Sequence, residues 1–169
     1  NNSGTANGNA TLAVGKFGQS GTFDGTDDYV SVTDSNSLDV TYVTLAGWIN
    51  ATALGGAIVA KATGAAGTDG YLMDTSGSKI RFCATGGCVS STTTLSTSAW
   101  QHIAVTFDGT TVRFYLNGVF VDNENIVAAG NNIDNIYLGQ FGPNTSNFYF
   151  DNLLINNTTG SDEPAYPDD

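Results

Sequence analysis

Few residues of this chain have the types and spacing that catalysis requires. The two glutamates, Glu124 and Glu163, stand far apart in the sequence. Glycoside hydrolysis, for example, needs two carboxyl groups that flank the scissile bond at a fixed separation. The single histidine, His102, has no nucleophile partner at a motif spacing. The sequence therefore predicts a protein that is not an enzyme.

The two cysteines are the clearest covalent feature. Cys83 and Cys88 flank Ala-Thr-Gly-Gly in a stretch with a strand–turn–strand pattern, so their thiols should face each other across a hairpin. A disulfide there closes a short loop and contributes about 2 kcal/mol in the chain-entropy description. Two free thiols are the alternative, whereas the spacing and the lone histidine do not fit a zinc site. A disulfide implies an oxidising compartment.

The charge balance excludes several classes of partner. The formal net charge is −11, with 16 acidic against 5 basic residues, and the basic residues are scattered. Nucleic-acid binding requires clustered Lys and Arg that neutralise phosphates, so nucleic acids and anionic membranes are poor partners. No apolar run approaches the ~20 residues of a membrane span. Most of the acidic residues are aspartates, which serve solubility but also offer oxygen ligands for calcium.

β-strands must position these groups. The chain has 21 glycines and only 12% charged residues, a composition that suits strands and tight turns rather than helices. Short β-like runs alternate with turn signals, which is typical of a sandwich or barrel. The predicted strands cover residues 29–32, 42–50, 57–62, 71–75, 79–83, 100–121 (with turns at Asp108-Gly109 and Asn117-Gly118), 136–138 and 148–155. Residues 1–156 are predicted to form one domain, and residues 157–169 an acidic, proline-containing tail.

Four stretches in order resemble the LamG-like jelly-roll family, within the concanavalin A-like lectin/glucanase superfamily. They are GKFGQSGTFDGTDDYVSV (15–32), YVTLAGWIN (42–50), WQHIAVTFDGTTVRFYLNGV (100–119) and FYFDNLLI (148–155). The resemblance implies two stacked antiparallel sheets in jelly-roll order. The E-x-D-x-E pattern of the superfamily's β-glucan hydrolases does not occur in this sequence.

The resemblance also implies a calcium site. In similar jelly rolls a cation joins the loop after the Phe-Asp-Gly to the closing strand, and the matching ligands here are Asp24, the Gly25 carbonyl and Asp151. Calcium takes six to eight oxygens, so carbonyls and waters would complete such a set. A buried carboxylate at Asp151 is costly unless it is paired or bound to metal. The alternative is that Asp24 caps a turn and Asp151 faces solvent.

One expected strand does not occur in the sequence. Members of the family open with an apolar strand just before the Asn/Gly-rich segment that stands here at residues 1–11. Because that strand pairs with the closing one, residues 148–155 are expected to present an open, apolar edge. Either the sequence is a truncated piece, or a neighbouring copy donates the strand and builds a homopolymer.

The leading hypothesis is a secreted or cell-surface binding or adhesion module that is stabilised by calcium and recognises a glycan or protein ligand. One alternative is a structural subunit or display domain of a surface filament or pilus-like assembly. Another is an accessory carbohydrate-binding module of a secreted glycosidase. Aromatic platforms for sugar would come from Tyr71, Tyr137, Phe141 and Tyr149, beside Asp69 and Asn144, although no pattern orders them.

Overall fold

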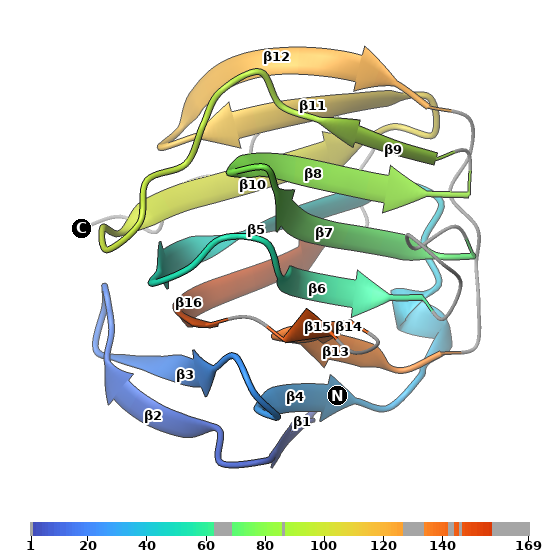
Figure 1. Cartoon of the computed structure of the whole chain (residues 1–169). Helices are drawn as coiled ribbons and strands as arrows, with labels where there is room; N and C mark the ends of the chain where they lie inside the picture. The colour runs from blue at the N-terminus through green and yellow to red at the C-terminus, as the bar shows by residue number, and fades with distance from the viewer. Residues whose placement is uncertain are drawn as a thin grey trace.

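Two antiparallel sheets stack face to face in the computed structural model, which describes residues 2–62, 69–85, 87–126, 134–141, 144–145 and 147–156. The order in the first sheet is β1 (Gly4–Asn7), β4 (Tyr29–Val32), β13 (Ile136–Leu138), β6 (Ala57–Lys61), β7 (Tyr71–Ser76), β8 (Lys79–Ala84) and β9 (Gly87–Ser90). The order in the second is β12 (Val119–Asn125), β11 (Thr111–Leu116), β10 (Gln101–Phe107), β5 (Val43–Ala51), β16 (Asn147–Asn156), β3 (Gln19–Asp24) and β2 (Thr11–Val14). Figure 1 shows the two layers, and the predicted two-sheet sandwich is confirmed.

Two smaller elements complete the described chain. A short antiparallel pair is formed by β14 (Gln140–Phe141) and β15 (Asn144–Thr145), and one 3-10 turn, η1, covers Asn36–Leu38. None of the described helical structure has the length and apolarity needed to cross a membrane. The predicted tail at residues 157–169 lies outside the described residues.

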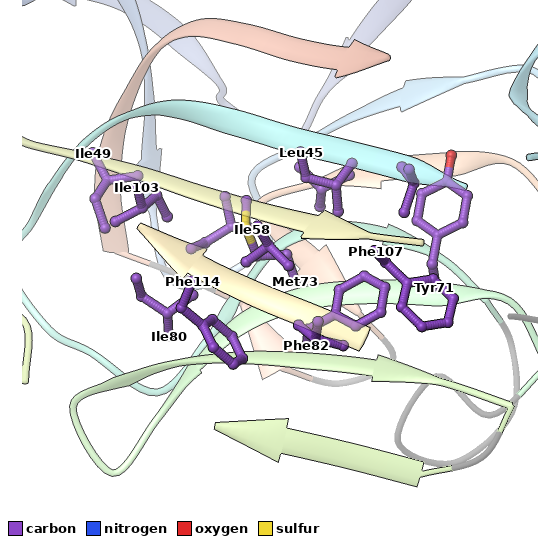
Figure 2. Close-up of a cluster of buried hydrophobic side chains, with 14 of the residues drawn as sticks. Leu45, Ile49, Ile58, Tyr71, Met73, Ile80, Phe82, Ile103, Phe107 and Phe114 are labelled. Atoms are coloured by element: carbon purple, nitrogen blue, oxygen red, sulfur yellow. The ribbon is translucent and has the colours of Figure 1, made fainter. Parts of the chain in front are cut away.

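Side chains of alternate residues meet between the sheets in one apolar core. Leu45 and Ile49 of β5 point inward from the second sheet, and Phe82 of β8 points inward from the first (Figure 2). The Phe82 and Phe107 rings lie 5.4 Å apart and join the two layers. Fully burying a side chain of this size contributes about 1.5–3 kcal/mol, so this seam supplies much of the stability.

An ion cluster around the buried Lys61 fixes one end of the first sheet. The Lys61 ammonium, at the end of β6, lies 2.8 Å from an Asp34 oxygen and 2.9 Å from an Asp39 oxygen. It also donates to the Asp134 carbonyl at 3.0 Å. Burial alone lowers the pKa of Lys61, but the two carboxylates outweigh it and raise that pKa above its ordinary value. The lysine thus links β6 to the segments that enclose η1 and precede β13.

The closing strand is not an edge. Strand β16 lies inside the second sheet, with β5 along one side and β3 paired to its first half, residues 147–150. The prediction of an open edge at 148–155 is therefore wrong for residues 148–150, where β3 occupies that position; residues 151–156 pair only with β5 among the described strands. Residues 1–11, expected only as an Asn/Gly-rich segment, contain β1 and the start of β2. The strands at the margins of this sheet are β2 and β12.

The two cysteines face each other as cross-strand partners. Cys83 of β8 pairs in register with Cys88 of β9, and a disulfide joins them. Cys83 is fully buried, while β9 is the margin of the first sheet among the described strands. The bond therefore holds a marginal strand onto the sheet.

Removing this disulfide should reduce stability without changing the fold. We expect the Cys83→Ala/Cys88→Ala double variant to lose about 2 kcal/mol of unfolding free energy in urea titrations, because the unfolded chain regains the entropy of a short loop. The wild-type protein in excess reductant is the matched control and should lose a similar amount. Equal midpoints for oxidised protein, reduced protein and variant would contradict this role.

Candidate functional site

The loop between β3 and β4 is shaped by two aspartates that bind backbone amides. The Asp24 carboxylate accepts a hydrogen bond from the Thr26 amide at 2.7 Å, and Gly25 turns the chain with a φ of 79°. Asp28 is buried, with 3% of its surface exposed. One of its oxygens accepts from the Asn9 amide and the other from the Asp24 amide. Asp28 therefore ties this loop to the turn between β1 and β2.

Three carboxylates converge in this loop. One oxygen from each of Asp24, Asp27 and Asp28 lies within 4.8 Å of the others. Asp24 and Asp27 are exposed. A carboxylate oxygen has two lone pairs, so an oxygen that accepts one amide keeps a position for a cation. The donor set consists of hard oxygens and suits Ca²⁺ better than zinc or copper.

Asp24 and Asp151 do not belong to one site. Asp24 lies opposite Asn147, and Asp151 is four residues further along β16. At about 3.3 Å per residue this places them about 13 Å apart, too far to share an ion. Gly25 likewise packs against Asn147. The structure instead brings Asp27 and Asp28 beside Asp24. The signal for this cluster is the Asp-Gly-Thr-Asp-Asp run after Phe23, which has three carboxylates in five residues.

Asp151 has a different role. It is buried, with 5% of its surface exposed, and its carboxylate accepts from the Phe17 amide at 2.8 Å. Sequence reasoning left it either facing solvent or bound to metal. The structure gives it a backbone partner from a turn far away in the sequence, between β2 and β3. This bond fastens the β2–β3 hairpin to β16.

Asp151 begins a row of side chains on the outer face of the second sheet. It pairs in register with Trp48, and Trp48 pairs with His102. The Trp48 ring lies edge-on to His102 at 5.4 Å and to Phe17 at 5.9 Å. The Lys16 ammonium lies 4.9 Å from the centre of the Trp48 ring, a distance at which a cation is attracted to the ring face.

A second row lies on the same face, two residues away from the first row along strands β5 and β16. We call it the aromatic row, and it consists of Trp100, Asn50, Tyr149 and Thr22. Tyr149 pairs in register with Asn50 on one side and with Thr22 on the other. The Trp100 ring lies 6.4 Å from the Tyr149 ring. All four side chains are half-buried and none carries a charge. Rings beside amide and hydroxyl groups are the surface that a sugar ring requires.

The acidic loop lies at one end of this face. Successive residues of a strand alternate between its faces, so Asp24 and Thr22 of β3 point to the same side. Asp24 is the last residue of β3, and the other two carboxylates of the cluster follow in the loop. The aromatic row and the acidic loop therefore form neighbouring parts of one surface.

The other aromatic residues considered for a sugar platform do not gather there. Tyr71 is buried, and its hydroxyl donates to the Leu38 carbonyl at 3.3 Å. Burial, with the charges of Asp39 and Asp34, raises the pKa of Tyr71. Tyr137 lies against Tyr29. The side chains of Phe141 and Asn144 are outside the described part of the structure, and Asp69 is half-buried.

Acid should destabilise the protein through His102. Burial lowers the pKa of this histidine below its ordinary value near 6.5, so the unfolded chain binds the proton first as the pH falls. The histidine's contribution is therefore complete above pH 6.5 and is lost below it, at up to about 1.4 kcal/mol per pH unit. In urea titrations at pH 7.5 and 5.5, His102→Gln should lose less stability than the wild type. An equal loss of unfolding free energy in the wild type and in His102→Gln between pH 7.5 and 5.5 would contradict this role of His102.

Known structures share this architecture at low sequence identity. Domain 4 of AbnA, a GH43 extracellular arabinanase from Geobacillus stearothermophilus solved with arabinotriose, superposes with a TM-score of 0.67 at 16% identity, covering 90% of this chain and 81% of that one. A putative carbohydrate-binding protein from Bacteroides ovatus gives 0.65 at 18% identity over 80% of this chain and 42% of its own. The binding domain of botulinum neurotoxin DC, solved with rat synaptotagmin II, gives 0.68 at 14% identity over 92% of this chain and 43% of its own.

These likenesses describe the fold: one structure holds arabinotriose, one is described as a putative carbohydrate-binding protein and one as a toxin binding domain, and the superfamily also includes glucanases. A search of curated protein sequences finds no match. The family model described as the concanavalin A-like lectin/glucanases superfamily matches residues 24–163, which is most of the sequence. The chain therefore belongs to the Laminin_G_3 family of this superfamily.

Proposed function

We propose that the chain is a non-catalytic, extracellular glycan-binding module that uses the outer face of the second sheet. The aromatic row carries this proposal. Two rings 6.4 Å apart, with Asn50 and Thr22 beside Tyr149, offer both apolar stacking and hydrogen bonds to a sugar. Because the row has no charged side chain in a chain of net charge −11, its ligand is a neutral saccharide.

The carboxylates support binding rather than hydrolysis. Asp28 uses both oxygens to accept backbone amides, and Asp151 accepts the Phe17 amide. Glu124 lies on β12, at the far margin of the sheet from Asp24. Asp24 and Asp151 flank the aromatic row on this face, but they lie about 13 Å apart, more than the ~5–9.5 Å between the two carboxyl groups of a glycoside hydrolase.

Calcium is the cofactor that this site supports best, at Asp24, Asp27 and Asp28. When bound, the divalent ion would offset two of the three carboxylate charges and stiffen the loop next to the aromatic row. Extracellular calcium modules bind in the 10⁻⁴–10⁻³ M range, and two exposed carboxylates with one buried carboxylate fit such a modest site. The Cys83–Cys88 disulfide supports an exported protein, because such bonds persist in oxidising compartments.

An accessory module of a secreted glycosidase would use the same face in the same way. The likeness to a domain of an extracellular arabinanase favours this context over a filament subunit. If no saccharide binds in a screen, a protein ligand becomes the favoured alternative.

Saccharide binding should depend on the aromatic row. On an array of neutral arabino-, xylo-, gluco- and manno-oligosaccharides, we expect the wild type to bind at least one class. Calorimetry with that sugar should show at least a tenfold loss of affinity, about 1.4 kcal/mol, for Trp100→Ala and for Tyr149→Ala. Tyr42→Ala removes an exposed tyrosine that precedes β5 and is the matched control. An array with no bound sugar, or with acidic sugars only, would refute the proposed function.

Calcium should raise the melting temperature. With a Kd near 10⁻⁴ M, 2 mM CaCl₂ stabilises the folded state by about 1.8 kcal/mol relative to chelator, enough to move the Tm by several degrees. Asp24→Asn/Asp27→Asn should abolish this shift, while Glu124→Gln, on exposed β12, should keep it. A wild-type Tm that is the same in calcium and in chelator would contradict the proposed calcium site.

A further inference from the structure

Strand β2 is one margin of the second sheet. It pairs with β3 and, among the described residues, with no other strand. Leu12 is 66% exposed and Val14 is 88% exposed, the highest value of any large hydrophobic residue described. The opposite margin, β12, carries Asp122 and Glu124, charges of the kind that prevent edge-to-edge pairing. Residues 8–15, which include β2, have no charge at all.

The two apolar side chains point to the inner side of the sheet. Leu12 lies opposite Gly21, which shares a face with the core residue Phe23. Their high exposure shows that nothing described covers them from the first sheet. Figure 1 shows β2 at the lower margin of the sandwich. A partner for this edge must therefore supply both a strand and apolar side chains on that side.

We propose that the partner is a second copy of this chain, with two β2 strands paired antiparallel about a twofold axis at Ala13. In that register Leu12 of each copy lies opposite Val14 of the other. The four side chains then share one face and cover one another, which is the self-complementarity that a twofold interface requires.

The charges at the two ends of β2 set the orientation. Lys16 follows the strand. At the other end, the Asn9 amide donates to Asp28, and Gly8 lies against the Asp27 backbone. Antiparallel pairing brings the lysine end of one copy beside the acidic end of the other, whereas parallel pairing would place like charges together. Opposite charges therefore favour the antiparallel dimer.

The dimer should be weak. A four-residue strand pair buries much less than the ~1,600 Å² of a standard interface, so dissociation in the micromolar to millimolar range is expected. Backbone hydrogen bonds between the two edges and the four apolar side chains are its main contacts.

Sedimentation velocity across a concentration series tests the proposal. We expect the wild-type chain to shift from monomer to dimer with concentration, and Val14→Lys to raise the dimer Kd at least tenfold. Val119→Lys, at a valine 67% exposed on β12, is the matched control and should dimerise like the wild type. Circular dichroism confirms that each variant is folded.

A mixture of variants tests the register. Leu12→Lys with Val14→Glu should form a heterodimer more tightly than either variant forms a homodimer, because the two new charges lie opposite each other in the antiparallel pair. A wild type that stays monomeric at millimolar concentration overturns the proposal. A dimer that Val119→Lys breaks and Val14→Lys leaves intact also overturns it. So does a mixture of Leu12→Lys with Leu12→Glu that forms a tighter heterodimer than the mixture of Leu12→Lys with Val14→Glu.

Discussion

The buried carboxylate of Asp28 is the constraint on which the N-terminal part of the molecule depends. Such a group is costly away from water unless its oxygens are hydrogen-bonded, and here both oxygens accept backbone amides. One amide belongs to the turn before β2 and the other to the end of β3. The same contacts that satisfy Asp28 thus fix the loop in which Asp24 and Asp27 converge, and set where β2 begins.

The alternation of side chains along each strand determines the outer face of the second sheet. Once Leu45, Gly47 and Ile49 of β5 face the core, Trp48 and Asn50 must face outward. Their register partners on β10 and β16 then align in rows across the sheet. The packing of the inner face therefore determines which side chains lie on the outer face, where the aromatic row lies beside the acidic loop. Strand β16 leaves regular geometry just past Asp151, where its register against β5 shifts and Asn152 has a φ of 53°.

The sequence was most informative where the signal is local. Alternation at Ile103, Val105 and Phe107 predicted β10, and Asn117-Gly118 predicted the following hairpin, whose two turn residues have positive φ. The cysteine pair was predictable because a hairpin sets its own register. Strands β1, β2 and β3 were missed, because β1 (GTAN) and β3 (QSGTFD) have few apolar residues and the apolar residues of β2 (TLAV) are consecutive rather than alternating. The partner of Asp151 could not be found, since the Phe17 amide is 134 residues away and only topology brings it near. The assignment of Asp24 and Asp151 to one ion came from the family resemblance, whereas the strand register places the two residues about 13 Å apart.

Binding of a neutral saccharide on the outer face of the second sheet can be observed residue by residue. The most direct measurement is an amide and indole chemical-shift titration of the ¹⁵N-labelled chain with the tightest-binding oligosaccharide from the array. We expect the Trp100 indole signal and the amides around Asn50, Tyr149 and Thr22 to move together with one Kd. Shifts confined to the first sheet, with those signals unmoved at saturation, would contradict it.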